Sequence, residues 1–530
     1  MKLLYAGLLC LLLPVPCAAR IITVDDDAPA DFNNIQAAID DANDGDVVIV
    51  QPGTYTGPGN RDIDFKGKAI TVRSTDPNGQ DTVASTIIDC NGTEEESHRG
   101  FYFHSGESRD SVLEGLTIIN GLDGTGAGIL CISGASPTIR NNIIRNNRIL
   151  YDSDGGAGIA CFYGASPLIQ NNEIRDNHCE PGGGGGGIRC YQAGSPVIKN
   201  NFIFRNSASQ GGGMCVDFCS STISDCTFHG NMAAGMGGGI LIDGDPTIAN
   251  CTFRGNSAEE GAGMYHYRGN TALTSCSFIG NSAKYRGGAI YSARDNHLTL
   301  RTCLFTGNKA GNMGGAIYGH GYSGPSESIL INCTFAGNLA PNGKALACDS
   351  YLQMYPSVIA AANTILWDGG GEIWNNDSST ITITHSDITG AWLGSGNINS
   401  DPCFADPGHW DANGTPDDAN DDFWVDGDYH FKSQAGRWKP ATQAWITDDV
   451  TSPCIDAGDP MSPIGREPFP NGGIINMGAY GSTAEASKSY FGEPVCKTIV
   501  AGDINGDCKV DFADLTIMAR QWLEDKNQQR

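Results

Sequence analysis

The sequence predicts an all-β protein, a solenoid of stacked coils of the right-handed parallel β-helix type, and three observations support this. One short phrase recurs about eight times between Gly126 and Ala340. Each phrase alternates apolar and polar residues over four to six positions and is cut by Gly, Asn, Asp or Ser-Pro, as short strands between tight turns are. The apolar residue after each Gly pair recurs at intervals of 30, 29, 26, 26, 24, 26 and 27 residues, at Ile129, Ile159, Ile188, Met214, Ile240, Met264, Ile290 and Ile317. Units of this length stack because none can bury its own apolar face, so equivalent residues form columns ~4.8 Å apart.

The first 19 residues carry a targeting signal. Lys2 precedes an apolar run, and Cys17, Ala18 and Ala19 are small residues before a cleavage point. This pattern is typical of a secretory signal and is too short for a membrane span. Lipid attachment at Cys17 is the alternative. We therefore expect an exported protein without a spanning helix.

Residues 21–56 predict a helix that seals the first coil, followed by a strand at 47–50. Asp31 is the expected N-cap, Gly45 ends the helix, and its apolar face is formed by Phe32, Ile35, Ile39 and Ala42. The phrases DFNNIQAAIDDANDGDVVIVQPGTY (31–55) and FKGKAITVRS (65–74) resemble the opening of pectin-lyase-like right-handed β-helix proteins. That resemblance implies a solenoid over residues 20–486, with residues 126–340 as its regular array.

Cysteine and asparagine recur in register with the strands of the array. One predicted column holds Cys131, Cys161, Cys190 and Cys215, and a second holds Cys226, Cys251, Cys276, Cys303 and Cys333. Free Cys packs as a small hydrophobe, so we interpret both columns as packing ladders, with disulfides as the alternative. Asparagines that can hydrogen-bond from coil to coil recur at Asn231, Asn256, Asn281, Asn308 and Asn338. The phrases GGAIY (287–291) and CTFRGN (251–256) resemble the repeats of polymorphic outer-membrane proteins.

From residue 350 to 486 the repeats weaken while strand patterns continue. The phrases GNINSDPCF (396–404), SPCIDAGDP (452–460) and NMGAYG (476–481) resemble the closing part of secreted bacterial β-helix proteins. The acidic stretch 411–422 alternates carboxylates with Asn and Gly, so it is either a calcium site or a solvated loop.

Residues 487–530 predict a linker and a calcium-binding half-module. Positions 1, 3, 5, 7, 9 and 12 of a calcium loop are filled by Asp503, Asn505, Asp507, Lys509, Asp511 and Asp514, with Lys509 ligating through its carbonyl. The loop and the helix after it resemble a dockerin repeat, which implies attachment to a cohesin-bearing or cell-surface scaffold. The chain departs from that pattern because Cys508 replaces the usual Gly and only one repeat is present. A bridge from Cys508 to Cys496 is a further alternative.

An outward-facing column of tyrosines is the predicted binding surface. If the apolar markers point inward, period-two alternation turns Tyr265, Tyr291 and Tyr318 outward, with Tyr267 and His320 on the same face. Flat rings one coil apart could stack on sugars, or could only stack on one another for stability. A basic column that suits carboxylates, or that is again structural, holds Arg145, Arg175, His229 and Arg254.

The functional prediction combines these features. The 60 acidic against 33 basic residues give a net charge of −27, which argues against nucleic acid and anionic membranes as partners. Gly319-His320-Gly321 resembles the polygalacturonase motif without its partner carboxylates, so no catalytic residue is assigned. We expect an exported, calcium-binding β-helix that recognises an extracellular polysaccharide, with lyase or glycoside hydrolase activity left open. The alternative is a non-catalytic surface or adhesion protein.

Overall fold

The computed structural model describes residues 19–150, 155–179, 182–415, 421–492, 502–504 and 509–521. Residues 1–18 of the predicted signal segment lie outside the described residues, as do the predicted calcium ligands Asn505 and Asp507 and the cysteines Cys496 and Cys508. Within the described residues, no helix is both long and apolar enough to cross a membrane.

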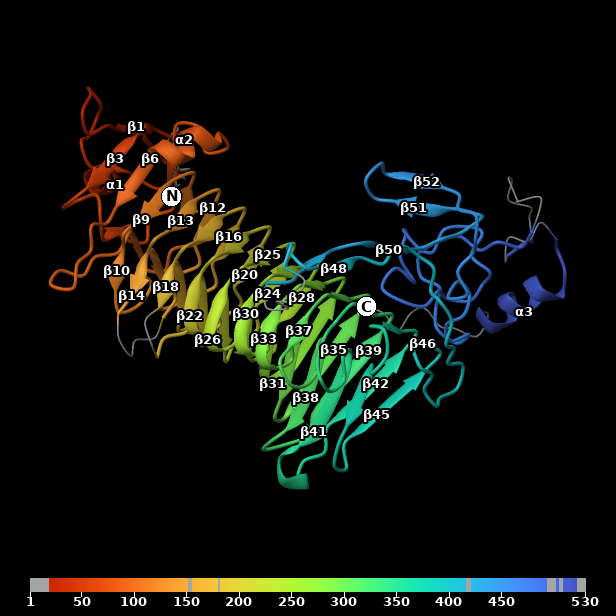
Figure 1. The fold of residues 1–530 in the computed structure, drawn as a ribbon. Helices are drawn as coiled ribbons and strands as arrows, with labels where there is room; N and C mark the ends of the chain where they lie inside the picture. The colour runs from red at the N-terminus through yellow and green to blue at the C-terminus, as the bar shows by residue number, and fades with distance from the viewer. Residues whose placement is uncertain are drawn as a thin grey trace, which may run out of the picture.

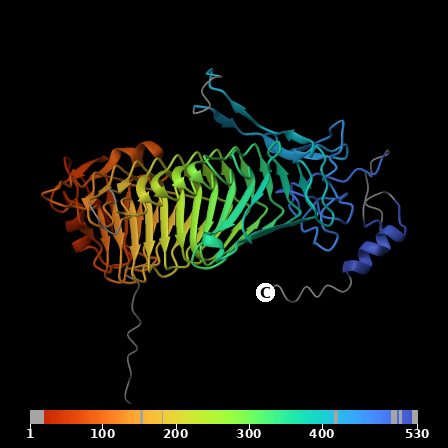
Figure 2. The ribbon, with the colours of Figure 1, turned by 60° about the horizontal axis from the view of Figure 1, so that its bottom comes forward.

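The chain winds into a parallel solenoid that is extended along one axis (Figures 1 and 2). A regular coil contributes strands in turn to four sheets, which we name C, A, B and D in the order in which the chain meets them. Sheet B has 13 strands and sheet D has eight, whereas β31 (Met264–Thr274) belongs to both C and A and joins them into one sheet of 25 strands. Equivalent strands of successive coils pair in parallel throughout.

The strands of sheets C and A are as follows. Besides the first part of β31, sheet C holds β4 (Ile63–Asp64), β7 (Phe101–Phe103), β11 (Ile129–Cys131), β15 (Ile159–Phe162), β19 (Ile188–Tyr191), β23 (Met214–Asp217), β27 (Ile240–Asp243), β34 (Ile290–Ala293), β38 (Ile317–Gly321), β41 (Leu346–Ser350) and β44 (Ile373–Asn375). Besides the second part of β31, sheet A holds β1 (Ile21–Val24), β2 (Val47–Val50), β5 (Thr71–Ser74), β8 (Val112–Glu114), β12 (Thr138–Arg140), β16 (Leu168–Gln170), β20 (Val197–Lys199), β24 (Thr222–Ser224), β28 (Thr247–Ala249), β35 (Asn296–Arg301), β39 (Ser326–Ile331), β42 (Val358–Ala362) and β45 (Thr380–Thr384).

The strands of sheets B and D complete each coil. Sheet B holds β3 (Gly53–Thr56), β6 (Thr86–Asp89), β9 (Thr117–Ile119), β13 (Ile143–Arg145), β17 (Glu173–Arg175), β21 (Phe202–Phe204), β25 (Thr227–His229), β29 (Thr252–Arg254), β32 (Ser277–Ile279), β36 (Leu304–Thr306), β40 (Thr334–Ala336), β43 (Ile365–Trp367) and β46 (Asp387–Ile388). Sheet D holds β10 (Leu122–Asp123), β14 (Arg148–Ile149), β18 (His178–Cys179), β22 (Ser207–Gln210), β26 (Met232–Met236), β30 (Ser257–Glu260), β33 (Ser282–Arg286) and β37 (Lys309–Ala310).

The coil register is the one that the sequence predicts. The eight apolar markers, from Ile129 to Ile317, form seven successive pairs along sheet C. Coils of unequal length keep this register because extra residues are accommodated outside the marker positions, in part as register shifts within strands such as the one between Ile242 and Asp243. The predicted parallel solenoid is therefore confirmed, residue by residue, over the array.

The interior of the solenoid is built from columns of identical side chains. Five phenylalanines on sheet B stack with ring centroids 4.6–5.1 Å apart and planes within 4–9° of parallel: Phe228, Phe253, Phe278, Phe305 and Phe335. All five are fully buried. Each ring thus contacts the equivalent ring above and below it, and every coil adds the same contacts as the last.

The predicted asparagine ladder is confirmed and extends further than the sequence suggested. In each step, the side-chain oxygen of one Asn accepts both the backbone N–H and the side-chain NH₂ of the Asn one coil before, as Asn281 does from Asn256 at 3.0 and 2.9 Å. The ladder begins at Asn147 and ends at Asp368, which accepts the same two bonds from Asn338. The buried side-chain amides of this ladder are therefore satisfied between coils, whereas Oδ2 of Asp368 at its end has no hydrogen-bond partner among the described residues.

The second cysteine column continues another asparagine column. Asn142, Asn172 and Asn201 hydrogen-bond from coil to coil, and Cys226 then takes the next position, with its sulfur 3.5 Å from the backbone nitrogen of Asn201. All cysteines in the described part of the chain are free. Cys215 does not belong to the first column, which is a correction. It pairs with Arg189, one residue out of register with Cys190, and therefore faces outward.

The N-terminal end carries a helix that is shorter than predicted. Helix α1 spans Ile35–Asp41, and its N-cap is Asn34, whose side chain accepts the Ala37 N–H. Asp31 is not the N-cap, because its carboxylate instead accepts the backbone N–H and the hydroxyl of Thr23. The buried face of α1 joins the solenoid core, while its role as a cap stays a prediction. A second short helix, α2, spans Gln80–Ser85, and a 3₁₀ turn spans Tyr351–Gln353.

The parallel coils end at β46, well before the predicted limit of residue 486. The following segment forms three antiparallel pairs: β47 (Phe404–Asp406) with β50 (Asp428–Phe431), β48 (His409–Asp411) with β49 (Phe423–Val425), and β51 (Arg437–Lys439) with β52 (Ala444–Ile446). This segment returns over the outer face of the last coils of sheet B, where Phe404, Tyr429 and Met477 pack against Leu304 and Ile365 (Figure 1). Helix α3 (Phe512–Gln521) follows at the C-terminal end.

Candidate functional site

The predicted tyrosine column faces outward from sheet C but is not exposed. Tyr265, Tyr291 and Tyr318 are 6, 3 and 0% exposed and form a cluster separate from the solenoid interior. Tyr265 stacks on Tyr291 at 4.7 Å, and Tyr291 meets Tyr318 edge-on at 5.0 Å. Two methionines from the side of sheet D pack against the cluster. Met236 is the last residue of β26, and Met313 forms a bridge to Arg286 of β33. The three tyrosine side chains point outward, as predicted. The prediction that they form an exposed binding surface is wrong, because they are buried at the corner between sheets D and C.

A hydrogen-bonded group containing His320 borders this cluster. Asp349 follows His320 by one coil in sheet C, and its Oδ1 lies 2.6 Å from His320 Nδ1 and accepts the Tyr318 hydroxyl at 2.5 Å. Burial and the neighbouring tyrosine and carboxylate raise the pKa of Tyr318 well above its ordinary value. A carboxylate at Nδ1 favours the tautomer that leaves Nε2 as the basic atom, the arrangement of a general acid–base histidine. Sequence reasoning placed His320 on this face but gave no sign of Asp349.

A half-buried ion pair borders the tyrosine cluster. The Glu260 carboxylate is 3.6 Å from the Arg286 guanidinium, which also lies over the Tyr318 ring at 5.6 Å. Burial raises the pKa of Glu260 despite the attraction of Arg286. The corner therefore holds a carboxyl group that binds a proton more readily than a surface glutamate does.

The exposed aromatic rings of this face lie farther along each strand than predicted. Tyr163, Phe218, Tyr322 and Tyr351 are 49, 54, 40 and 42% exposed. Tyr191 connects the first two, with centroids 6.0 Å from each, and Tyr322 lies 4.5 Å from Tyr351. We name Tyr163, Phe218, Tyr322 and Tyr351 the outer ring line. Strand alternation could not reveal it, because these residues lie in or beyond the turns that end the strands.

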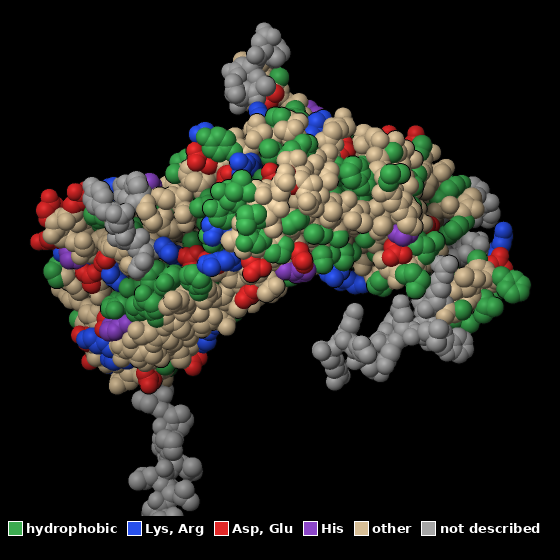
Figure 3. All heavy atoms as spheres, turned by 90° about the horizontal axis from the view of Figure 1, so that it is seen from below, with side chains coloured by type: hydrophobic (Ala, Val, Ile, Leu, Met, Phe, Trp, Pro, Cys, Tyr) green, Lys and Arg blue, Asp and Glu red, His purple; other side chains and the backbone are tan. Residues whose placement is uncertain are grey.

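Arginines interleave with the outer ring line. Arg268 lies 5.6 Å from the Phe218 ring and 5.1 Å from the Tyr267 ring. Arg294 lies 4.2 Å from Tyr267 and 4.9 Å from Tyr322. Tyr267 is thus half-buried between two guanidinium groups. Figure 3, which views the solenoid from below Figure 1, shows hydrophobic side chains with basic and acidic ones among them on this side.

Two of these rings stand on an unfavourable backbone. Tyr163 and Phe218 have φ of 47° and 53°, the left-handed region in which Gly and Asn are usual. Ser133, in the equivalent turn one coil before Tyr163, shares this conformation at 58°. A bulky residue there costs on the order of 1 kcal/mol or more, so these rings are present despite the backbone.

The predicted basic column is in register but does not form one surface. Phe204 interrupts it between Arg175 and His229. Arg175 pairs with Glu173 and Asp176, whereas Arg254 pairs with Asp426 at 3.3 Å. The first part of the column is therefore neutralised locally, and the second part meets the returning C-terminal segment.

The two ends of the predicted calcium loop lie together. Asp503 and Asp514 are 4 and 3% exposed. The Asp514 carboxylate accepts the N–H of Ile504 at 2.6 Å and of Asp511 at 2.7 Å, which closes the loop. Lys509 and Asp511 are exposed. Asp503 and Asp514, at positions 1 and 12 of the predicted loop, are thus two buried carboxylates at the ends of the loop. Calcium prefers carboxylate oxygens as ligands, so these two residues fit a calcium ion.

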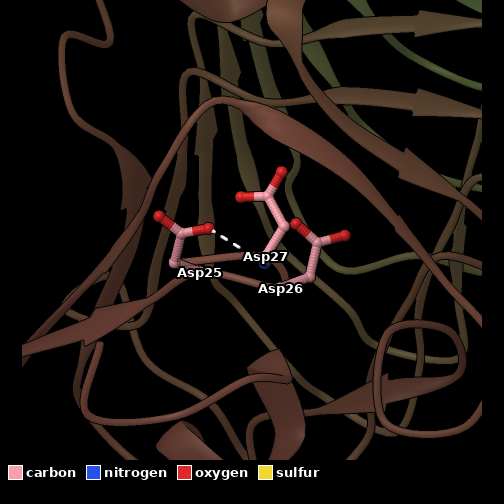
Figure 4. Close-up of side chains that lie close together, drawn as sticks. All are labelled: Asp25, Asp26 and Asp27. Atoms are coloured by element: carbon pink, nitrogen blue, oxygen red, sulfur yellow. Dashed lines mark hydrogen bonds between the residues drawn. The ribbon is translucent and has the colours of Figure 1, made fainter. Parts of the chain in front are cut away.

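A second acidic group, not predicted from the sequence, lies at the N-terminal end. The carboxylate oxygens of Asp25, Asp26 and Asp27 all lie within 4.8 Å of one another (Figure 4). The Asp27 N–H bonds to Asp25 at 3.2 Å, and the Asp25 carboxylate raises the pKa of Asp27. Asp26 and Asp27 are exposed, as acidic surface residues commonly are, so the group carries no assignment.

Comparisons with known proteins agree with the fold. The right-handed β-helix region matches residues 76–258, a disaggregatase-related region matches 326–458, and the Chlamydia polymorphic membrane protein repeat matches 275–293 and 302–320. No curated protein matches the chain. Among solved structures, a pectate lyase is similar at 12% identity and a TM-score of 0.34, over 88% of this chain and 97% of that chain. An alginate lyase from Paenibacillus sp. str. FPU-7 is similar at 12% identity and a TM-score of 0.31, over 68% and 99%. The family matches and the strand pairing together confirm a right-handed parallel β-helix with repeats of the polymorphic membrane protein type.

Proposed function

We propose that this protein is an exported β-helix that recognises an extracellular polysaccharide along the outer face of sheet C. The observation that carries the proposal is the outer ring line with its interleaved arginines. Successive coils are ~4.8 Å apart, so the rings are separated by one or a few such steps. This spacing is close to the length of one or a few sugar units in an extended polysaccharide. Aromatic faces stack on sugar rings, and guanidinium groups bind hydroxyl or carboxylate oxygens.

The strained backbone separates this function from a structural role. Gly at 163 and 218 would remove each ring and relieve the left-handed conformation at once. The double variant Tyr163→Gly/Phe218→Gly should therefore keep or raise the melting temperature. If each ring contributes roughly 0.5–1.5 kcal/mol of stacking, the affinity of the double variant for a long polysaccharide should be lower than that of the wild type on the order of tenfold.

Ser133→Gly is the matched control, because it changes the same turn one coil away without removing a ring. Binding is measured by affinity electrophoresis against a panel of neutral and acidic polysaccharides. A double variant that binds as the wild type does and melts at a lower temperature would assign the rings a structural role and refute the proposal.

Cleavage is decided in the same incubations, by following reducing ends and unsaturated uronides. With Asp349 orienting its ring, His320 is the residue placed to transfer a proton. If the wild type forms products, His320→Ala should abolish them while binding persists. If the wild type binds and releases no product, the role is that of a non-catalytic surface or adhesion protein.

We further propose that the C-terminal loop binds calcium and that the module attaches the protein to a scaffold. The buried pair Asp503 and Asp514 supports the calcium site. Phe512, Leu515 and Met518 leave an exposed apolar stripe on α3, which supports a protein partner of the cohesin type. Asp503→Ala in the full chain should remove one calcium site in calorimetry. The triple variant Asp25→Asn, Asp26→Asn, Asp27→Asn is the control and should leave that site intact.

A further inference from the structure

The asparagine ladder ends in a pair of buried acids. Asp368 takes the ladder position one coil after Asn338, and Glu372 follows four residues later, at the other end of a short turn. The two acids are 6 and 3% exposed. Neither forms an ion pair within the described residues, and carboxyl groups are rarely buried without one. The proposed function uses neither group.

A turn of three glycines brings the two acids together. Gly369, Gly370 and Gly371 have φ of 82, 93 and 74°, a left-handed run that other residues adopt only with strain. Glu372 folds back into this turn, and its Oε1 accepts the backbone N–H of Gly370 at 2.8 Å and of Asp368 at 3.0 Å. Its carboxylate is thereby held as a hydrogen-bonding neighbour of the Asp368 side chain.

The hydrogen bonds at Asp368 leave one of its oxygens without a donor. Oδ1 accepts the backbone N–H and the side-chain NH₂ of Asn338 at 2.7 and 2.9 Å. Oδ2 is buried and receives no hydrogen bond from any described group. An ionised Glu372 offers acceptors only. Two ionised carboxylates in this arrangement would therefore repel each other in a buried site, with one oxygen unsatisfied.

Lys344 is the cation at this turn, and it does not neutralise the pair. Its Nζ donates to the backbone carbonyl of Asp368 at 3.1 Å, and no ion pair joins it to either carboxyl group in the described part of the chain. Burial and the neighbouring Glu372 carboxylate raise the pKa of Asp368 well above its ordinary value. A proton bound between the two acids accounts for these observations together.

We propose that Asp368 and Glu372 share one proton and form a pH-sensitive latch on the last coils of the solenoid. With the proton bound, Oδ2 of Asp368 donates to Glu372 and the unsatisfied oxygen gains a partner. Without it, the two groups repel each other and the turn opens.

The latch controls how β44 is held on β41. Glu372 directly precedes β44, and its carbonyl accepts the backbone N–H of Leu346 in β41 at 2.9 Å. The two strands then pair in parallel. Because β41 also carries Asp349, which lies beside His320, the latch is one coil away from the proposed binding face.

The direction of the pH dependence follows from the proton. An aspartate in the unfolded chain releases its proton at about pH 4, whereas the folded turn keeps it to a higher pH. The folded turn therefore loses stability as the pH rises from about 4 through the raised pKa of Asp368, and the latch is closed on the acid side. Each pH unit in this interval lowers protection against hydrogen exchange by up to about tenfold.

The test compares the full-length wild type with Asp368→Asn by hydrogen exchange from pH 5 to pH 8, corrected for the intrinsic rate at each pH. Asn fills this ladder position in the coils before, and its NH₂ gives Glu372 a donor that does not titrate. In the wild type, protection of residues 368–375 should fall with rising pH relative to β40. In the variant it should stay constant.

Two further variants complete the comparison. Glu372→Gln supplies a non-titrating donor from the other side of the pair and should also remove the pH dependence. Asp225→Asn changes an exposed acid of the solenoid and should keep the wild-type dependence.

The latch is refuted if wild type and Asp368→Asn show the same pH dependence in residues 368–375. It is also refuted if both amide variants are less protected than the wild type at every pH, because the turn would then require a charged carboxylate. A fall in protection that is equally large in β40 would show that pH acts on the whole solenoid, and this too would overturn the inference.

Discussion

The regular array and the C-terminal segment that covers sheet B are stabilised in different ways. In the array, each coil repeats the contacts of its neighbour, as the Phe278 ring does between Phe253 and Phe305. Between residues 401 and 492, contacts are made once each, and several involve buried acids. Glu467 of this segment is a buried carboxyl that accepts the backbone N–H groups of Asn476 and Ser482. Asp456 is a partly buried carboxyl that accepts the Ser489 hydroxyl.

This difference separates a part of the molecule whose stability rests mainly on groups that do not titrate from a part that depends on buried carboxyl groups. Burial raises the pKa of Asp456 to about 6 and of Glu467 to about 8. The interior of the array is instead formed mainly by apolar side chains and neutral amides and thiols, with His266 as a buried titratable group whose pKa burial lowers to about 3. Stacked repeats therefore distribute stability evenly, whereas the covering segment depends on single groups whose charge changes with pH.

The largest expected effect comes from breaking the coil register. Deleting residues 264–289 removes one coil of 26 residues and joins Gly263 to Ile290, so that Phe253 stacks on Phe305 and Asn256 meets Asn308. This variant should fold. Deleting only residues 264–276 turns inward residues outward and should abolish folding. Equal solubility and equal β-sheet content by circular dichroism in the two variants would contradict the column model.

A cavity in the phenylalanine column should have the next largest effect. Phe278 is fully buried, so Phe278→Ala should lower the free energy of unfolding by about 3–5 kcal/mol. The loss should be the same at pH 5 and pH 8, since no titrating group is involved. Phe423→Ala, at a side chain that is 48% exposed, is the control and should cost less than about 0.5 kcal/mol. Urea unfolding at both pH values measures this, and a pH-dependent loss would contradict it.

In the covering segment, Glu467→Gln should be stabilising, and more so at higher pH. The folded pKa of about 8 lies above the unfolded value of about 4.3, so the folded state holds an extra proton between these limits and loses stability as the pH rises through them. Gln keeps the acceptor for Asn476 and Ser482 without titrating. Its advantage should grow by roughly 2–3 kcal/mol from pH 5 to pH 7. Parallel stability curves for the two proteins over this range would show that Glu467 does not titrate there.

Sequence periodicity predicted the array well because each marker position is tested eight times. Ile240 or Met264 alone would be ambiguous, but their common interval fixes the register and the inward direction. A contact that is made only once produces no repeat in the sequence. The approach of Asp349 to His320 requires the exact coil height, and the position of Trp424 over Gly307 joins segments more than a hundred residues apart. The direction of the tyrosines could be predicted, whereas their burial could not, because sheet D covers them.

The same contrast applies at the N-terminal end, where a single side chain begins α1. The Asn34 oxygen accepts the Ala37 N–H at 2.9 Å, so Asn34→Ala should cost about 1 kcal/mol, the smallest of these effects. Asn33→Ala changes the neighbouring exposed asparagine and should be nearly neutral. Because α1 joins the core through Ile35, Ala38 and Ile39, the loss should appear as faster hydrogen exchange in β1 and β2 and not in β29 or β32. Uniformly faster exchange through the array would instead mean that the helix holds the whole solenoid closed, and that the end and the array unfold as one unit.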